Sequence, residues 1–121
     1  MQFFKAFAIA ALSSPVFTWA VFDVGCLTRN NSPVIEDVTD CINQLYNRGG
    51  DCPHGNSACN TLVSHGSATI KLCGAKLQTT DLTCSQVAGY ANDIQQMCQI
   101  NGLAEGTAVV NATQRVVVGH S

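Results

Sequence analysis

Seven cysteines constrain the fold of this chain more than any other feature of its sequence. All of them follow residue 20, and no two form a CxxC pair. We therefore expect a disulfide framework with one thiol left over. The candidates are Cys26, Cys41, Cys52, Cys59, Cys73, Cys84 and Cys98. The pairing stays open, with a local Cys52–Cys59 clasp as one candidate. Three states of the odd thiol also stay open: buried and inert, joined to a second copy in a disulfide-linked dimer, or paired with a cysteine of a partner protein.

The first twenty residues have the pattern of a secretory signal peptide. Lys5 precedes an apolar run from Ala6 to Leu12, and small residues lead to a cleavage position after Ala20. The run is too short to cross a hydrocarbon layer, which takes about 20 apolar residues. We expect residues 1–20 to be removed and residues 21–121 to form a single secreted, extracellular domain with no stable membrane anchor. In that setting cysteines form disulfides.

The composition limits which classes of partner the chain can bind and which residue types can form its core. Without Lys5, five basic residues stand against eight acidic ones, and no basic patch is present. This balance argues against nucleic acid or an anionic membrane as the main target. Few aromatic residues remain after residue 20, so the core must consist of Val, Ile, Leu and Ala. Three disulfides at about 2–4 kcal/mol each would then supply much of the net stability.

Two helices are expected. The first has Ser32 as N-cap and Pro33 at its first position, and it stops at Gly49-Gly50. Its apolar stripe is Val34, Val38, Cys41, Ile42 and Leu45, and its acidic residues Glu36, Asp37 and Asp40 are expected on the solvent side.

The second helix starts with a capping box at Thr83-Cys84-Ser85-Gln86 and ends by Gly102. Its apolar stripe is Cys84, Val87, Ala88, Ala91, Ile94 and Cys98. Gly89 is unfavourable inside a helix, which suggests that another backbone passes close to it.

Alternation and β-branched residues predict the strands. The clearest is Ser67–Cys73, with Ala68, Ile70 and Leu72 on one face. Others are expected at residues 21–27, 61–63, 107–110 and 115–118, and a hairpin partner at residues 75–82. The run 116–118 is apolar without alternation, which suits an inner strand covered on both faces. The predicted order is β-α-β-β-α-β-β, an α+β domain stapled by disulfides.

No catalytic or metal-binding motif is found, so we expect no enzyme activity, no cofactor and no metal. Asp51, His54 and His65 lie near two cysteines, but HExxH spacing is missing and oxidised cysteines cannot ligate a metal. A third hypothesis is a small hydrolase or ribonuclease that uses His54 or His65 with Glu36, but the spacing of these residues does not favour it. Asn30 and Asn111 begin N-glycosylation sequons, and the second is better placed because Pro33 follows the first.

The run CGAKLQTTDLTCSQVAGYANDIQQMC, followed by GLAEGTAVV and RVVVGHS, resembles small cysteine-rich secreted effectors of plant-pathogenic fungi. It is similar to the killer-toxin-like α/β-sandwich proteins and to secreted-in-xylem effectors. The resemblance implies two helices packed on one face of an antiparallel sheet. It also implies a virulence effector that binds a host protein or a second secreted effector, in the apoplast or xylem or after uptake. The alternative that it implies is an antimicrobial or killer-type toxin acting on competing microbes. We expect the interaction surface on the loop 51–66 or on the outward face of a helix.

Overall fold

The computed structural model describes residues 24–53, 59–74 and 82–121. In chain order, the elements of this part are β2 (Val24–Cys26), α1 (Ile35–Arg48), β3 (Cys59–His65), β4 (Ala68–Cys73), α2 (Cys84–Cys98), β5 (Gly106–Val109) and β6 (Arg115–His120). This order confirms the predicted β-α-β-β-α-β-β pattern. The proposed signal peptide and the hairpin partner expected from Ala75 lie outside the described residues, apart from Leu82 at its end.

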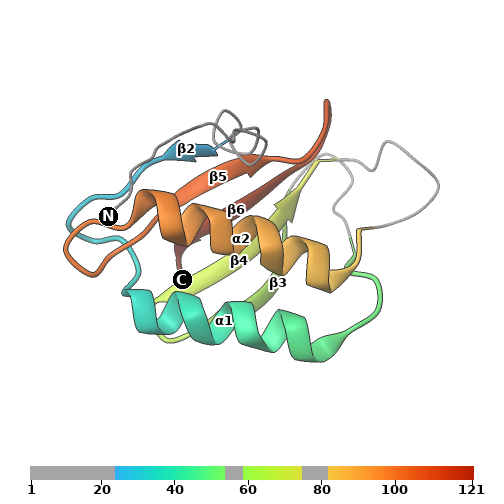
Figure 1. The fold of residues 1–121 in the computed structure, drawn as a ribbon, viewed down its shortest axis with the longest axis horizontal. Helices are drawn as coiled ribbons and strands as arrows, with labels where there is room; N and C mark the ends of the chain where they lie inside the picture. Colours follow the sequence, from blue (N-terminus) through green and yellow to red (C-terminus); the bar gives the residue numbers. More distant parts are fainter. Residues whose placement is uncertain (1–23, 54–58, 75–81) are drawn as a thin grey trace, which may run out of the picture.

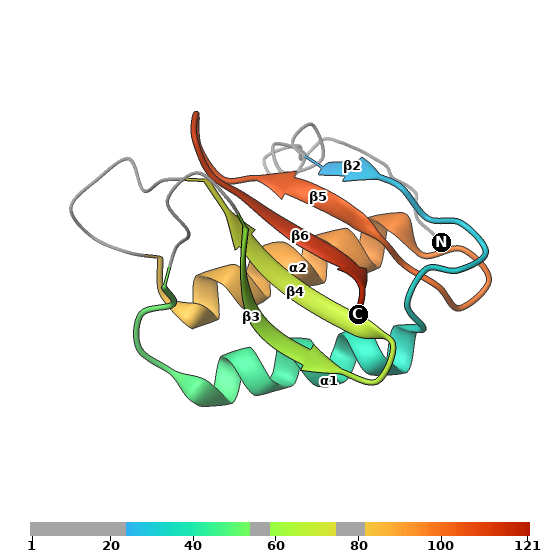
Figure 2. The same cartoon turned by 180° about the vertical axis from the view of Figure 1, so that it is seen from behind.

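The strands form one antiparallel sheet in the order β2-β5-β6-β4-β3. Both helices lie side by side over the same face of this sheet (Figure 1). The reverse view shows the strands of the opposite face with no described helix in front of them (Figure 2). Two helices on one face of an antiparallel sheet is the arrangement that the sequence led us to expect.

The core lies between these two layers. On β4, Ile70 and Leu72 are fully buried, because the alternation along the strand turns them toward the helices. The six residues predicted for the inner stripe of α2 are all buried, which confirms that prediction. A glycine that does lie close to another backbone is Gly106 on β5, where a Cβ would overlap the Gly25 carbonyl of the neighbouring β2. The expectation for Gly89 was wrong, since a Cβ there would meet nothing within 4 Å.

The start of α1 differs from the prediction. Its N-cap is Val34, with no side-chain cap, and Val34 is 38% exposed rather than part of the inner stripe. Ser32 does not cap the helix: its oxygen accepts the Arg29 N–H at 2.8 Å, and its hydroxyl donates to the Glu105 carboxylate at 2.7 Å. The Val34 N–H instead donates to the Ser67 hydroxyl at 3.0 Å. A residue of the β3–β4 turn thus binds the N–H of the N-cap residue, and the first helical N–H, that of Ile35, donates to the Gly102 carbonyl at 2.9 Å.

The start of α2 follows the prediction. The Gln86 N–H donates to the Thr83 hydroxyl at 3.0 Å, and the Thr83 N–H donates to the Gln86 side-chain oxygen at 2.9 Å. These two bonds are the capping box that the sequence indicated. The helix ends at Cys98, before Gly102, so that Cys98 can join the sheet through a disulfide.

Candidate functional site

Three disulfides staple the described part of the chain: one joins β2 of the sheet to the end of α2, one joins the segment after α1 to the start of α2, and one joins β3 to β4. They join Cys26 to Cys98, Cys52 to Cys84 and Cys59 to Cys73. The expected Cys52–Cys59 clasp was therefore wrong. The physical reason is a short backbone pairing, in which the Cys52 N–H donates to the Leu82 carbonyl and the Cys84 N–H to the Gly50 carbonyl, both at 2.8 Å. This pairing brings Cys52 to the start of α2.

The odd cysteine is Cys41, which is fully buried on the inner side of α1. Its Sγ lies 3.7 Å from the Ala68 carbonyl. Burial, with the nearby charges of Asp37 and Asp40, raises the pKa of the Cys41 thiol to about 11. The thiolate is the reactive form of cysteine, so this thiol is inert in the folded chain. A disulfide-linked dimer through Cys41 would require the core to open.

The face of the sheet that the helices leave uncovered is the largest functional candidate. We call it the open sheet face, and its outward side chains include those of Thr61, Lys71, Thr107, Val109, Arg115 and Val117. The strand register places Thr107, Val117, Lys71 and Thr61 in one row across four strands. Val117 is half-buried and Val109 is 47% exposed. The inner strand β6 is thus covered on one face only, contrary to the prediction for residues 116–118.

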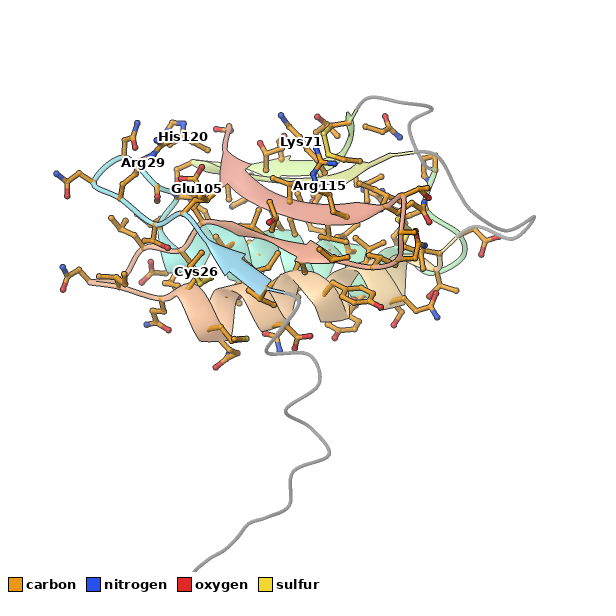
Figure 3. The ribbon with its side chains drawn as sticks, turned by 90° about the horizontal axis from the view of Figure 1, so that it is seen from above. Cys26, Arg29, Lys71, Glu105, Arg115 and His120 are labelled. Carbon is orange, nitrogen blue, oxygen red and sulfur yellow. A yellow bond between two sulfur atoms is a disulfide. The ribbon has the colours of Figure 1, made fainter. Side chains whose placement is uncertain are left out.

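Two cations project from the open sheet face. Lys71 on β4 and Arg115 on the neighbouring β6 point away from the helices (Figure 3). Neither forms an ion pair with another described residue. Near one end of the sheet, Arg29 and Glu105 do pair, at 3.9 Å. The two sheet cations are therefore available to a partner, and their strands hold them at a fixed spacing.

The helical layer carries the opposite charge. Its described acidic residues are Glu36, Asp37, Asp40, Asp51 and Asp93. The described cation of this layer is Arg48, whose guanidinium donates to the Leu62 carbonyl at 2.7 Å. A chain with an acidic net charge thus presents a cationic face where the sheet is open. Among the described residues, the positive charge of the open sheet face and the negative charge of the helical layer therefore lie on opposite sides of the domain (Figure 3).

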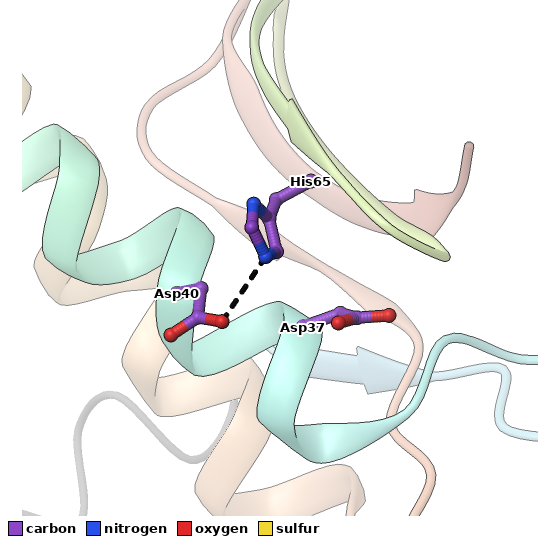
Figure 4. Close-up of side chains that lie close together, drawn as sticks. All are labelled: Asp37, Asp40 and His65. Carbon is purple, nitrogen blue, oxygen red and sulfur yellow. Dashed lines mark ion pairs between the residues drawn. The ribbon is translucent and has the colours of Figure 1, made fainter.

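A second candidate lies at the junction of α1 and the β3–β4 turn, where Asp37, Asp40 and His65 converge (Figure 4). The His65 Nε2 lies 3.2 Å from the Asp40 Oδ2, and both side chains are about half exposed. One potential ligand atom of each of the three residues lies within 4.8 Å of the others. Both His65 and the acidic residues were named from the sequence, but not as neighbours of one another. We call this group the α1–β3 cluster.

Asp37 is the most constrained member of the α1–β3 cluster. Its Oδ2 accepts hydrogen bonds from the Ser67 N–H at 2.7 Å and the Ser67 hydroxyl at 2.8 Å. These two bonds lower the pKa of the Asp37 carboxyl below its ordinary value of 3.8. Gly66 permits this contact, because a Cβ at that position would overlap the Asp37 carboxylate. Glu36 and Asp40 are exposed as expected, and Asp37 is partly exposed but also bound to Ser67, which the sequence did not indicate.

The other residues considered from the sequence do not form a site in the described part of the chain. His54 lies outside the described residues. Asp51 and Glu36 are exposed, and His65 pairs with Asp40 rather than with Glu36. The described residues line at least two hollows. One of about 290 Å³ is lined by Gln86, Gly89, Tyr90 and Asp93, and one of about 150 Å³ lies beside Arg115 at the β5–β6 turn.

The two sequons differ in accessibility. Asn30 is exposed in the turn before α1. Asn111 is half-buried, and its Oδ1 accepts hydrogen bonds from the Thr113 and Gln114 N–H groups at 2.9 Å. Its Nδ2, the atom that would carry a glycan, donates to the Gln114 side-chain oxygen at 2.9 Å. In the folded chain this second sequon therefore serves as a turn, while glycosylation at either position stays a prediction.

These features define a class: a cysteine-rich α+β domain, stapled by disulfides, with helices on one face of its sheet. None of the helices in the described residues has the length and hydrophobicity needed to cross a membrane. The three disulfides are compatible with an extracellular protein.

The chain belongs to the family described as a domain of unknown function, DUF8794, whose profile matches residues 22–119. No curated protein and no solved structure matches the chain.

Proposed function

We propose that this chain is a secreted virulence effector of a plant-pathogenic fungus that acts by binding a protein through its open sheet face. The observation that carries the proposal is the pair Lys71 and Arg115, two cations without ion partners in the described part of the chain, held on an uncovered sheet. The three disulfides support secretion, because such bonds persist in oxidising compartments. The partner is a host protein or a second secreted effector with an acidic surface.

The chemistry of the open sheet face suits such a contact. Val109 and Val117 offer apolar area, and Thr61 and Thr107 offer hydroxyl groups beside the two cations. Interfaces of this kind combine an apolar centre with polar groups that set orientation. Opposite charge on the partner would speed encounter and fix its register on the strands. Because the strands are hydrogen-bonded into a sheet, little backbone ordering is needed on binding.

The test is a comparison of two double variants of the oxidised, secreted protein. K71Q/R115Q removes both cations of the open sheet face. S85E/Q96E shifts the net charge by the same amount at exposed positions of α2. Each is used to capture partners from the apoplastic fluid and cytoplasmic extract of host plants. We expect the native protein and S85E/Q96E to retain the same specific partner and K71Q/R115Q to lose it. No specific partner in either fraction would refute the proposal.

The second candidate is a killer-type or antimicrobial toxin acting on competing microbes. This candidate is favoured by the arrangement of two helices on one face of an antiparallel sheet, because the resemblance to killer-toxin-like proteins implies the same arrangement. A growth assay on fungi and bacteria separates the candidates. Inhibition at micromolar concentrations without capture of a plant protein would favour the toxin, and absence of inhibition would remove it.

A further inference from the structure

We propose that Asp37, Asp40 and His65 form a binding site for a divalent transition-metal cation, with Zn²⁺ as the best fit. This inference is independent of the partner of the open sheet face. The three side chains come from two elements in different layers, α1 and β3, and meet where the β3–β4 turn passes over the helix (Figure 4). One imidazole nitrogen and two carboxylate oxygens are donors that Zn²⁺ accepts.

The spacing of the donor atoms suits a small cation. Two ligands bound to Zn²⁺ at about 2.1 Å in a tetrahedral arrangement are separated by roughly 3.4 Å. The His65 Nε2 and the Asp40 Oδ2 are already 3.2 Å apart. Asp37 supplies the third potential ligand atom, and the three atoms lie within 4.8 Å of one another. Rotation of the exposed Asp40 and His65 side chains can shorten these distances. The exposed side of the cluster leaves room for a water as fourth ligand.

Neighbouring groups hold the ligands in suitable orientations. Both Ser67 hydrogen bonds fall on the Asp37 Oδ2, which leaves Oδ1 for a cation. On the other side of the His65 ring, the Gln44 side-chain amide lies 3.5 Å from Nδ1. The amide atom nearest to Nδ1 is the nitrogen, so an ion at Nε2 would require this amide to turn over, and its oxygen would then accept the Nδ1 proton. Hydrogen bonds to the second nitrogen and to the carboxylate are the usual supports of metal ligands.

The charge of the cluster also calls for a cation. Two carboxylates and a neutral imidazole carry a charge of −2, matching one divalent ion. No described Lys or Arg forms an ion pair with either carboxylate. A bound ion would join the first half of α1 to the end of β3, and so would add a non-covalent link between the layers in addition to the Cys26–Cys98 disulfide. Binding to the folded state alone raises stability.

The test uses the untagged, oxidised protein freed of metal by a chelator and titrated with ZnCl₂ or MgCl₂ in a calorimeter. We expect one Zn²⁺ per chain, weaker binding of Mg²⁺, and at least about tenfold weaker Zn²⁺ binding in Asp40→Asn and His65→Asn. His120→Asn is the matched control, because it removes an exposed imidazole at the end of β6. Its affinity should equal that of the native protein. Equal Zn²⁺ affinity in all four proteins, or no binding to the native protein, would overturn the proposal.

A second readout needs no variant. In the native protein, the imidazole resonances of His65 should shift during the Zn²⁺ titration, while those of His120 stay in place. Thermal unfolding of the native protein should move to higher temperature with Zn²⁺, and that of His65→Asn should not. Shifts confined to His120, or an equal thermal shift in His65→Asn, would place the ion elsewhere and refute the α1–β3 cluster as its site.

Discussion

The Asp37 carboxylate accepts both the backbone N–H of Ser67, at 2.7 Å, and its hydroxyl, at 2.8 Å. The same hydroxyl accepts the N–H of Val34 at 3.0 Å, at the start of α1. The Ser67 carbonyl accepts the N–H of Ser121 at 2.9 Å. Through Ser67, the first turn of α1, the β3–β4 turn and residue 121 are therefore held in one network. The pH dependence of stability follows from this arrangement.

Asp37→Asn should flatten the loss of stability at acid pH. The folded-state pKa of Asp37 lies below its ordinary value of 3.8, first because of the Ser67 N–H and then because of its hydroxyl. The ionised group therefore stabilises the fold above pH 3.8, and this contribution is lost as the pH falls through the lowered pKa. Urea unfolding between about pH 2 and 6 measures the effect. Asp51→Asn, an exposed control, should keep the native slope, and an equal slope in Asp37→Asn would contradict the account.

Gly89→Ala should stabilise the protein by about 0.5–1 kcal/mol, because glycine is a poor residue inside a helix. A Cβ at this position meets nothing within 4 Å, so no clash offsets the gain. The same substitution at Gly66 should destabilise, since its φ is +56° and a Cβ would overlap Asp37. Thermal unfolding of the two variants measures both effects. A lower melting temperature for Gly89→Ala would show that the outer side of α2 is covered.

The Cys41 thiol should resist alkylation until the protein unfolds. It is fully buried and its pKa is raised to about 11, so the native chain offers little thiolate. Mass spectrometry after iodoacetamide treatment should show no adduct on the native oxidised protein and one adduct in guanidinium. Rapid labelling of the native protein, or a covalent dimer under non-reducing conditions, would contradict the buried position.

Removing Cys26–Cys98 should cost more stability than removing Cys59–Cys73. The first bridge joins residues separated by 72 positions and the second by 14. The loop-closure model gives a difference of about 1.5 kcal/mol between the two. Denaturant unfolding of the paired alanine variants C26A/C98A and C59A/C73A measures it. Peptide mapping without reduction first checks the connectivity, and a Cys52–Cys59 peptide would refute it.

Much of the fold could be predicted from the sequence because local signals and tertiary packing agree. The capping box at Thr83 and the six-residue apolar stripe of α2 both predicted the same helix, and the structure confirms both features. The start of α1 could not be predicted in the same way. Ser32 has the chemistry of an N-cap, but Glu105 takes its hydroxyl through a contact that the local sequence does not reveal.

The candidate sites depend on register, which the sequence left open. Alternation placed Lys71 on the outer face of its strand, but only the pairing of β4 with β6 puts Arg115 on the same face, diagonal to Lys71 and opposite Cys73. The Cys59–Cys73 bridge did leave a signal in the sequence. The β3–β4 hairpin turns at Gly66, and the two cysteines lie opposite each other at its open end, with one irregularity in the register between Thr61 and Val63. The α1–β3 cluster had none, because its members meet only after the helix packs on the turn.

The central claim is that the open sheet face is the contact surface, and its most direct test is the affinity of the captured partner for three purified proteins. Surface plasmon resonance at low and physiological salt would compare the native protein, K71Q/R115Q and S85E/Q96E. We predict equal affinity for the native protein and S85E/Q96E, with binding to both weakened by salt. For K71Q/R115Q we predict at least about tenfold weaker binding and a smaller salt dependence, because the two cations no longer meet the acidic partner. Unchanged affinity and salt dependence in K71Q/R115Q would contradict the account.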